Sequence, residues 1–250
     1  MFNKKYFLFM LSFFVLAVQL LFGQSKDMRV HKSDGNVIRT GISEIDSITF
    51  QTTGTVTDYD GNVYKTVKIG DQWWMAENLK VTHYRKGEVI PNVTDNTAWS
   101  NLTTGAYCEY DNNSENVETY GRLYNWYAVS DSRNIAPEGW HVPTDAEWST
   151  LVTYLGGASV AGGKLKETGT THWNSPNVGA TNESGFAALP GGSRSNNGYF
   201  NLLGYYAYFW SSTESGSNCA WSRTLYYVIA SVYRYDDGKQ YGFSVRLVRD

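Results

Sequence analysis

The sequence predicts an α+β domain in which paired terminal strands enclose two short helices and long ordered loops. β-branched and aromatic residues dominate residues 55–69 near the start and residues 221–235 and 242–248 at the end, which is typical of strands. A helical repeat with a capping signal lies between them, and the rest is rich in Gly, Asn, Ser and Thr. Strands at both ends with helices between them favour a fold whose first and last strands are neighbours.

The opening strands are expected to form a hairpin over residues 55–69. Its turn falls at Asp60-Gly61, because these residue types accept the backbone conformations of tight turns. Between residues 80 and 120, isolated aromatic residues stand among Asn, Thr, Gly and Asp. That composition predicts long ordered loops rather than regular elements.

Two helices are expected in the middle of the chain. The stronger one follows Thr144, which can cap the first turn while Glu147 reaches back to it, as in a Thr-x-x-Glu capping box. Apolar residues then repeat at three and four positions over residues 148–155, and Gly156 ends the pattern. The weaker helix is expected over residues 122–130.

Residues 1–23 have the layout of a cleavable secretory signal. Lys4 and Lys5 precede an apolar run over residues 6–22, and the small residue Gly23 follows it. A run of this length lies at the lower edge of what spans a bilayer, so cleavage is favoured over a retained membrane anchor. The protein is therefore expected to be secreted, periplasmic or on the cell surface, with membrane contact only through this segment before cleavage.

The segment that follows the signal is expected to form a small unit of its own. Over residues 24–50, β-branched residues flank Asp34-Gly35, which predicts a β-hairpin or a stalk. Residues 51–54 are polar and contain a glycine, as linkers do. Residues 55–250 are long enough to bury a core as one domain.

Charge and cysteine usage narrow the function classes. The 250 residues carry 21 Lys and Arg against 24 Asp and Glu, and the basic residues are scattered singly. Nucleic-acid binding needs a basic stripe, so that class is excluded. The two cysteines, Cys108 and Cys219, either form a disulfide or remain separate thiols, and the sequence leaves both alternatives open.

Complete catalytic motifs are missing from the sequence. The histidines do not have the short spacing that places two metal ligands on one helix face. Residues 156–164 resemble a phosphate-binding loop only superficially, and Gly-x-Ser-x-Gly does not occur. No cofactor is expected apart from calcium, for which the oxygen-rich stretch with Asp111, Asn113 and Glu115 is the candidate site, although such residues also form ordinary turns.

Aromatic residues in polar, Gly-rich stretches are the most informative positive feature. A flat ring with a polar tip, exposed in a loop, suits a sugar face or a protein hot spot. For any single ring, packing within the loop is the simpler explanation, so the prediction concerns the set. The candidate ligand-binding residues are Trp99, Tyr107, Tyr110, Trp173, Tyr199, Tyr205, Tyr206 and Tyr208.

Six ordered blocks between residues 70 and 250 carry a family resemblance: GDQWWMAENL, YGRLYNWYAV, GWHVPTDAEW, SGFAALPGGSR, FWSSTE and GFSVRLVRD. The chain resembles the Fibrobacter succinogenes major paralogous domain family of exported Bacteroidetes-type proteins. Residues 142–148 and 242–246 are more distantly similar to the formylglycine-generating-enzyme branch of the C-type-lectin-like fold. That likeness implies a mixed fold with paired terminal strands.

The chain differs from both resembled families in its cysteines. In the family, cysteines often stand where this chain has Ala136 and Leu247. If those cysteines pair in relatives, this chain has lost both partners together, and packing alone would hold its terminal strand. Formylglycine-generating enzymes use two cysteines near the C-terminus, and this chain has only Cys219 in that half.

These observations favour an exported, non-catalytic binding module for a polysaccharide or a cell-surface protein. Two alternatives stay open: an enzyme of unknown type on the formylglycine-generating scaffold, and a structural surface component without a small ligand.

Overall fold

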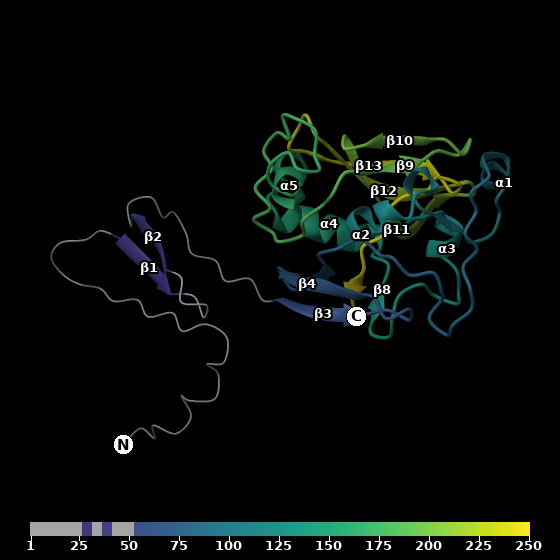
Figure 1. Cartoon of the computed structure of the whole chain (residues 1–250), viewed down its shortest axis with the longest axis horizontal. Coiled ribbons are helices and arrows are strands. Elements are labelled where there is room, and N and C mark those ends of the chain that lie inside the picture. Colours follow the sequence, from purple (N-terminus) through teal and green to yellow (C-terminus); the bar gives the residue numbers. More distant parts are fainter. Residues whose placement is uncertain (1–26, 32–36, 42–52) are drawn as a thin grey trace, which may run out of the picture. The chain divides into compact units, whose positions relative to one another are not determined.

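The computed structural model describes residues 27–31, 37–41 and 53–250 (Figure 1). The chain divides into two compact units, residues 1–50 and residues 51–250. In the first unit β1 (Asp27–His31) pairs antiparallel with β2 (Val37–Gly41). The turn expected at Asp34-Gly35 and the expected signal segment lie outside the described residues.

The first sheet of the second unit joins the two ends of the domain. Val248 near the C-terminus is paired with Trp74 on one side and His141 on the other. The last strand therefore lies next to the third opening strand, whereas the first opening strand is at the sheet edge. The strands in sheet order are β3 (Thr53–Thr57), β4 (Val63–Ile69), β5 (Gln72–Met75), β14 (Val248–Arg249) and β8 (Trp140–His141).

The start of the opening hairpin differs from the expectation. β3 begins at Thr53, and Gly54 is paired with Thr66, so two residues expected in the linker belong to the strand. A Cβ on Gly54 would lie 3.1 Å from Thr66 Oγ1, so a larger residue there would require the Thr66 side chain to shift slightly.

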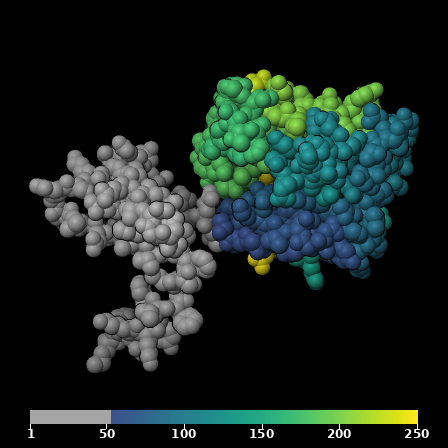
Figure 2. Space-filling model, in the orientation of Figure 1, coloured from purple at the N-terminus to yellow at the C-terminus, as the bar shows by residue number. Residues whose placement is uncertain are grey.

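The second sheet is formed by the C-terminal part of the chain. It contains β10 (Phe200–Leu203), β9 (Gly191–Arg194), β11 (Tyr206–Gly216), β12 (Cys219–Tyr226) and β13 (Val232–Gly238), in that order. The β11–β12–β13 part is an antiparallel meander, and β13 is an edge strand. A further pair joins β6 (Tyr107–Cys108) to β7 (Leu123–Tyr124). The opening strands, in blue, form one side of this unit, and the green segments that follow α4 form the opposite side (Figure 2).

Five α-helices occur in the described part of the chain, where two were expected. They are α1 (Asn96–Ser100), α2 (Glu115–Tyr120), α3 (Trp126–Val129), α4 (Asp145–Tyr154) and α5 (Ala158–Leu165), and a 3-10 turn, η2, spans Tyr110–Asn112. No helix among the described residues is long and apolar enough to cross a membrane. The α+β class is confirmed.

Helix α4 confirms the predicted capping box. The hydroxyl of Thr144 accepts from the N–H of Glu147 at 3.2 Å, and the carboxylate of Glu147 accepts from the N–H of Thr144 at 2.8 Å. The weaker helix was predicted too long: only Trp126–Val129 is helical, because Leu123 and Tyr124 before it are paired in β7.

Large aromatic side chains fill the space between the two sheets. The rings of Trp74 and Trp148 lie 4.8 Å apart, and Trp148 also contacts Phe186 and Phe209 at 5.8 and 5.7 Å. Rings of this size bury enough apolar area to replace the long aliphatic runs that the sequence lacks.

Three buried cations fasten the loops to this core, and each donates to backbone carbonyls. Lys166 Nζ donates to the carbonyls of residues 178, 226 and 229 at 2.9 to 3.0 Å. Arg194 reaches the carbonyls of residues 93, 94 and 198. Arg246 reaches those of residues 75, 186 and 187. A buried carbonyl without a donor is costly, so these contacts explain how long irregular segments stay ordered.

Candidate functional site

Four of the eight aromatic residues predicted to bind ligand are buried, and that prediction is wrong for them. Trp99 has no exposed surface, and its ring N–H donates to the carbonyl of Gln240 at 2.8 Å. Trp173 is 1% exposed and donates to the carbonyl of Ala188. Tyr107 and Tyr110 lie in the core clusters. The polar sequence around these rings forms loops that fold over them. Composition alone therefore predicted exposed rings where the structure has buried ones.

The other four predicted residues reach the surface but do not share one place. Tyr199 is 62% exposed beside the β9–β10 turn. Tyr205 packs edge-on against Tyr227, with ring centroids 5.1 Å apart. Tyr206 and Tyr208 are partly exposed on β11. Only this last pair belongs to a larger aromatic surface.

That surface is one face of the β11–β12–β13 meander, where five tyrosines gather. The register places Tyr206 opposite Tyr226. It also places Thr224 of β12 between Tyr208 on one side and Tyr233 on the other. Because side chains alternate along a strand, the side chains at these positions point to the same side. We call this surface the tyrosine platform; it consists of Tyr206, Tyr208, Tyr226, Tyr233 and Tyr235.

Ring contacts run through the whole platform. Tyr206 meets Tyr226 edge-on with centroids 4.4 Å apart, and Tyr226 meets Tyr233 edge-on at 5.0 Å. Tyr233 and Tyr235 are stacked within 6° at 5.8 Å, and Tyr206 lies 5.9 Å from Tyr208. The hydroxyls of Tyr226 and Tyr235 are hydrogen-bonded at 3.1 Å. Rings that hold one another in this way present a preorganised surface.

The platform is exposed toward its edge strand and anchored toward the core. Tyr233 is 36% exposed and Tyr235 is 42% exposed, both on β13. Tyr208 is stacked on buried Phe243 at 4.8 Å and 13°. The opposite face of the meander is covered, since Phe209 and Leu225 there belong to the core cluster that includes residues of α4 and α5. The tyrosines therefore lie on the side of the meander that remains partly open.

Polar groups lie between the rings. Ser222 Oγ donates to a carboxylate oxygen of Asp237 at 2.6 Å, and both residues belong to the platform face. The hydroxyl of Thr224, opposite Tyr208 and Tyr233, is buried and has no hydrogen-bond partner within the described chain. Burial raises the pKa of Tyr208, and the nearby Tyr206 and Asp237 raise it further, so its phenol stays protonated at neutral pH.

The sequence missed three of the five platform residues. Tyr226, Tyr233 and Tyr235 lie in strand-like sequence and were not counted among the loop aromatics. The available signal was the Tyr-x-Tyr spacing at 206/208 and 233/235, which places each pair on one face of a strand. Which strands pair is set by the fold, so the spacing alone would not have joined the two pairs.

The proposed calcium ligands do not converge. Asn113 Oδ1 accepts from the N–H of Glu115 at 3.0 Å, which is a local turn contact, and Asp111 has a φ of 55° within η2. Among the described residues, no three His, Cys, Asp or Glu side chains gather as a metal site would need. The structure thus gives these residues a role in the turn.

The cysteines are not bonded to one another. Cys108 is buried in β6 with Trp99 and Leu123, whereas Cys219 is partly exposed at the start of β12 in the second sheet. Of the two alternatives, separate thiols is the one observed. Ala136 and Leu247 are both fully buried in the same core cluster.

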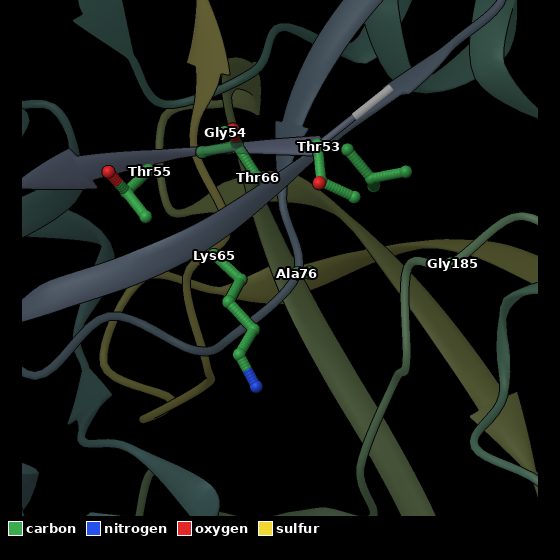
Figure 3. A pocket seen from close by; sticks show the side chains of 8 residues that line it. Thr53, Gly54, Thr55, Lys65, Thr66, Ala76 and Gly185 are labelled. Atoms are coloured by element: carbon green, nitrogen blue, oxygen red, sulfur yellow. The ribbon is translucent and has the colours of Figure 1, made fainter. Parts of the chain in front are cut away.

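A hollow of about 440 Å³ lies beside edge strand β3 (Figure 3). Its walls include Thr53, Gly54, Thr66 and Gly185, and Lys65 is the one charged residue among the described residues that line it. Small side chains and backbone surround this hollow, so it offers little chemistry beyond a single ammonium group.

Fold and site together define the class: an α+β domain whose loops are fastened by buried cations and whose second sheet presents a partly open tyrosine face. The chain belongs to the Fibrobacter succinogenes major domain family, whose model matches residues 67–249. The family resemblance of the six sequence blocks is thereby confirmed. No curated protein and no solved structure matches the chain. The more distant likeness to formylglycine-generating enzymes stays a prediction.

Proposed function

We propose that this protein is an exported, non-catalytic binding module that holds a polysaccharide on the tyrosine platform. The observation that carries the proposal is the continuous set of ring contacts on one sheet face, with Tyr233 and Tyr235 exposed at its edge. Sugar rings present flat C–H faces and a rim of hydroxyls. A tyrosine offers both an apolar ring for the face and a polar tip for the rim.

The form of the platform favours a polysaccharide over a surface protein. Protein hot spots centre on side chains that fill desolvated pockets. The platform is instead an open sheet face along β13, where the neighbouring rings of Tyr233 and Tyr235 are nearly parallel. Such a surface can contact successive sugars of a chain.

Retention on insoluble polysaccharides tests the proposal. We expect Tyr235→Ala and Tyr233→Ala each to weaken binding about tenfold, which corresponds to about 1.4 kcal/mol per ring. Tyr199→Ala is the matched control, because Tyr199 is at least as exposed but lies outside the platform. Urea unfolding of each variant checks that the fold is intact.

Two results would overturn the proposal. One is binding that Tyr199→Ala weakens as much as Tyr235→Ala does. The other is retention on none of the polysaccharides together with platform-dependent capture of a surface protein, which would move the site to the protein-binding class.

A further inference from the structure

The platform face carries one carboxylate that no described cation pairs with. The paired positions on this face of the meander are Tyr206, Tyr208, Trp210 and Glu214 on β11, Ala220, Ser222, Thr224 and Tyr226 on β12, and Tyr233, Tyr235 and Asp237 on β13. Besides the phenols, Glu214 and Asp237 are the ionisable groups among these positions, and Glu214 is ion-paired with Lys239. A ligand on this surface therefore meets one unpaired carboxylate, that of Asp237.

The carboxylate of Asp237 has no cationic partner among the described residues. Arg234, on the opposite face of the same strand, is paired with Asp145 at 2.8 Å and lies over the ring of Trp221. Lys239 is paired with Glu214, and its ammonium lies 4.8 Å from the ring centroid of Trp126. The nearest cations along the chain are thus already engaged elsewhere.

The surroundings of Asp237 disfavour an unpaired anion. Burial raises the pKa of its carboxyl, the hydrogen bond from Ser222 opposes this, and the charge of Asp236 adds to the rise. An ammonium group placed beside Asp237 would compensate the charge that burial destabilises. It would also lie against tyrosine rings, whose negative faces attract cations.

We propose, as an extension of the polysaccharide-binding function, that the preferred ligand is an amino-sugar polymer with free amines, whose ammonium group lies beside Asp237 among the platform rings. The platform rings hold the sugar faces, and the charge on Asp237 distinguishes a protonated amine from an acetylated one. Polymers with uronic acid or sulfate groups are repelled by the same carboxylate.

Calorimetric titration of the full chain with two probes tests the inference: β-linked glucosamine oligomers, and N-acetylglucosamine oligomers of equal length. We expect the glucosamine oligomer to bind about tenfold or more tightly. Asp237→Asn should abolish that preference, because the amide keeps the shape but loses the charge. Asp236→Asn is the control, since Asp236 belongs to the opposite face, and it should keep the preference.

The outcomes separate this inference from the function on which it rests. Equal binding of the two oligomers, with loss in Tyr235→Ala, overturns the amine preference and leaves polysaccharide binding standing. A preference that survives Asp237→Asn also overturns it. If neither oligomer nor any neutral glucan binds, both proposals fail.

Discussion

Replacement of Arg246 by methionine should destabilise the domain strongly without touching the platform. The guanidinium is fully buried and donates to the carbonyls of Met75, Phe186 and Ala187 and to the side-chain oxygen of Asn78, at 2.5 to 3.1 Å. Burial lowers the pKa of Arg246 to about 9, so it remains charged at neutral pH. Methionine fills a similar volume but donates nothing.

The magnitude follows from the acceptors left behind. Four oxygens would lose a donor, and each buried acceptor without a partner costs about 1–3 kcal/mol. Relief of the buried charge offsets part of this, so we expect a net loss of about 3–5 kcal/mol. A domain of this kind has a total unfolding free energy of about 5–15 kcal/mol, so the loss is a large share of it.

Urea unfolding followed by tryptophan fluorescence measures this loss. Arg249→Met is the matched control, because Arg249 is exposed at the end of β14, and it should change stability by less than about 0.5 kcal/mol. Equal stability of the Arg246→Met variant and the wild type would refute the view that buried cations hold the loops in place.

Three further predictions concern the N-terminal cap of α4, the buried phenol of Tyr84 and the two cysteine thiols. Thr144→Ala should lower the unfolding free energy by about 1 kcal/mol in the same assay, and no change would show that the observed capping box does not stabilise α4. Burial raises the pKa of Tyr84 to about 12 from 10.0. The free energy of unfolding that the protonated phenol contributes is therefore fully present below pH 10 and falls by about 3 kcal/mol as the pH rises toward 12. Urea unfolding across this pH range measures the fall, and a Tyr84→Phe variant should not show it. Iodoacetamide should modify Cys219 in the folded protein but Cys108 only after unfolding, because Cys108 is buried and burial raises the pKa of its thiol to about 12. Mass spectrometry measures the two rates, and equal rates in the folded protein would contradict the burial of Cys108.

Local sequence rules succeeded where one element carried its own signals. The capping box at Thr144 and Glu147 and the apolar repeat after it predicted α4, because both signals depend only on neighbours within a few residues. The class of the fold was also predictable, since strand-like sequence occurs at both ends of the domain.

Helix α5 was not among the predicted helices. Residues 158–165 are rich in small residues and carry no strong helix signal, but Gly162 and Gly163 allow close packing. A Cβ on Gly162 would lie 2.4 Å from the carbonyl oxygen of Ser231, and one on Gly163 would lie 2.2 Å from that of Gly179. Tertiary contacts of this kind leave no mark in the local sequence.

The binding surface was misplaced for a related reason. Polar sequence around Trp99 and Trp173 predicted exposed rings, yet the loops close over them. The rings that are exposed, Tyr233 and Tyr235, lie on an edge strand whose alternation was interpreted only as strand structure. The direction of a side chain depends on which sheet face remains open, and long-range pairing decides that.

The sequence blocks that identify the family contribute large buried side chains to the core. Trp74, Trp148, Phe186 and Arg246 all lie in those blocks and are buried together. None of the platform tyrosines lies in the six blocks. Family membership therefore accounts for the scaffold, whereas the proposed site depends on residues between the blocks.

A crystal structure of the domain with a bound glucosamine oligomer tests the account most directly. We predict that sugar rings lie against Tyr233 and Tyr235 and that an amine nitrogen lies within ion-pair distance of Asp237. An oligomer seated elsewhere, for example in the hollow beside Lys65, with the platform unoccupied, would contradict the account.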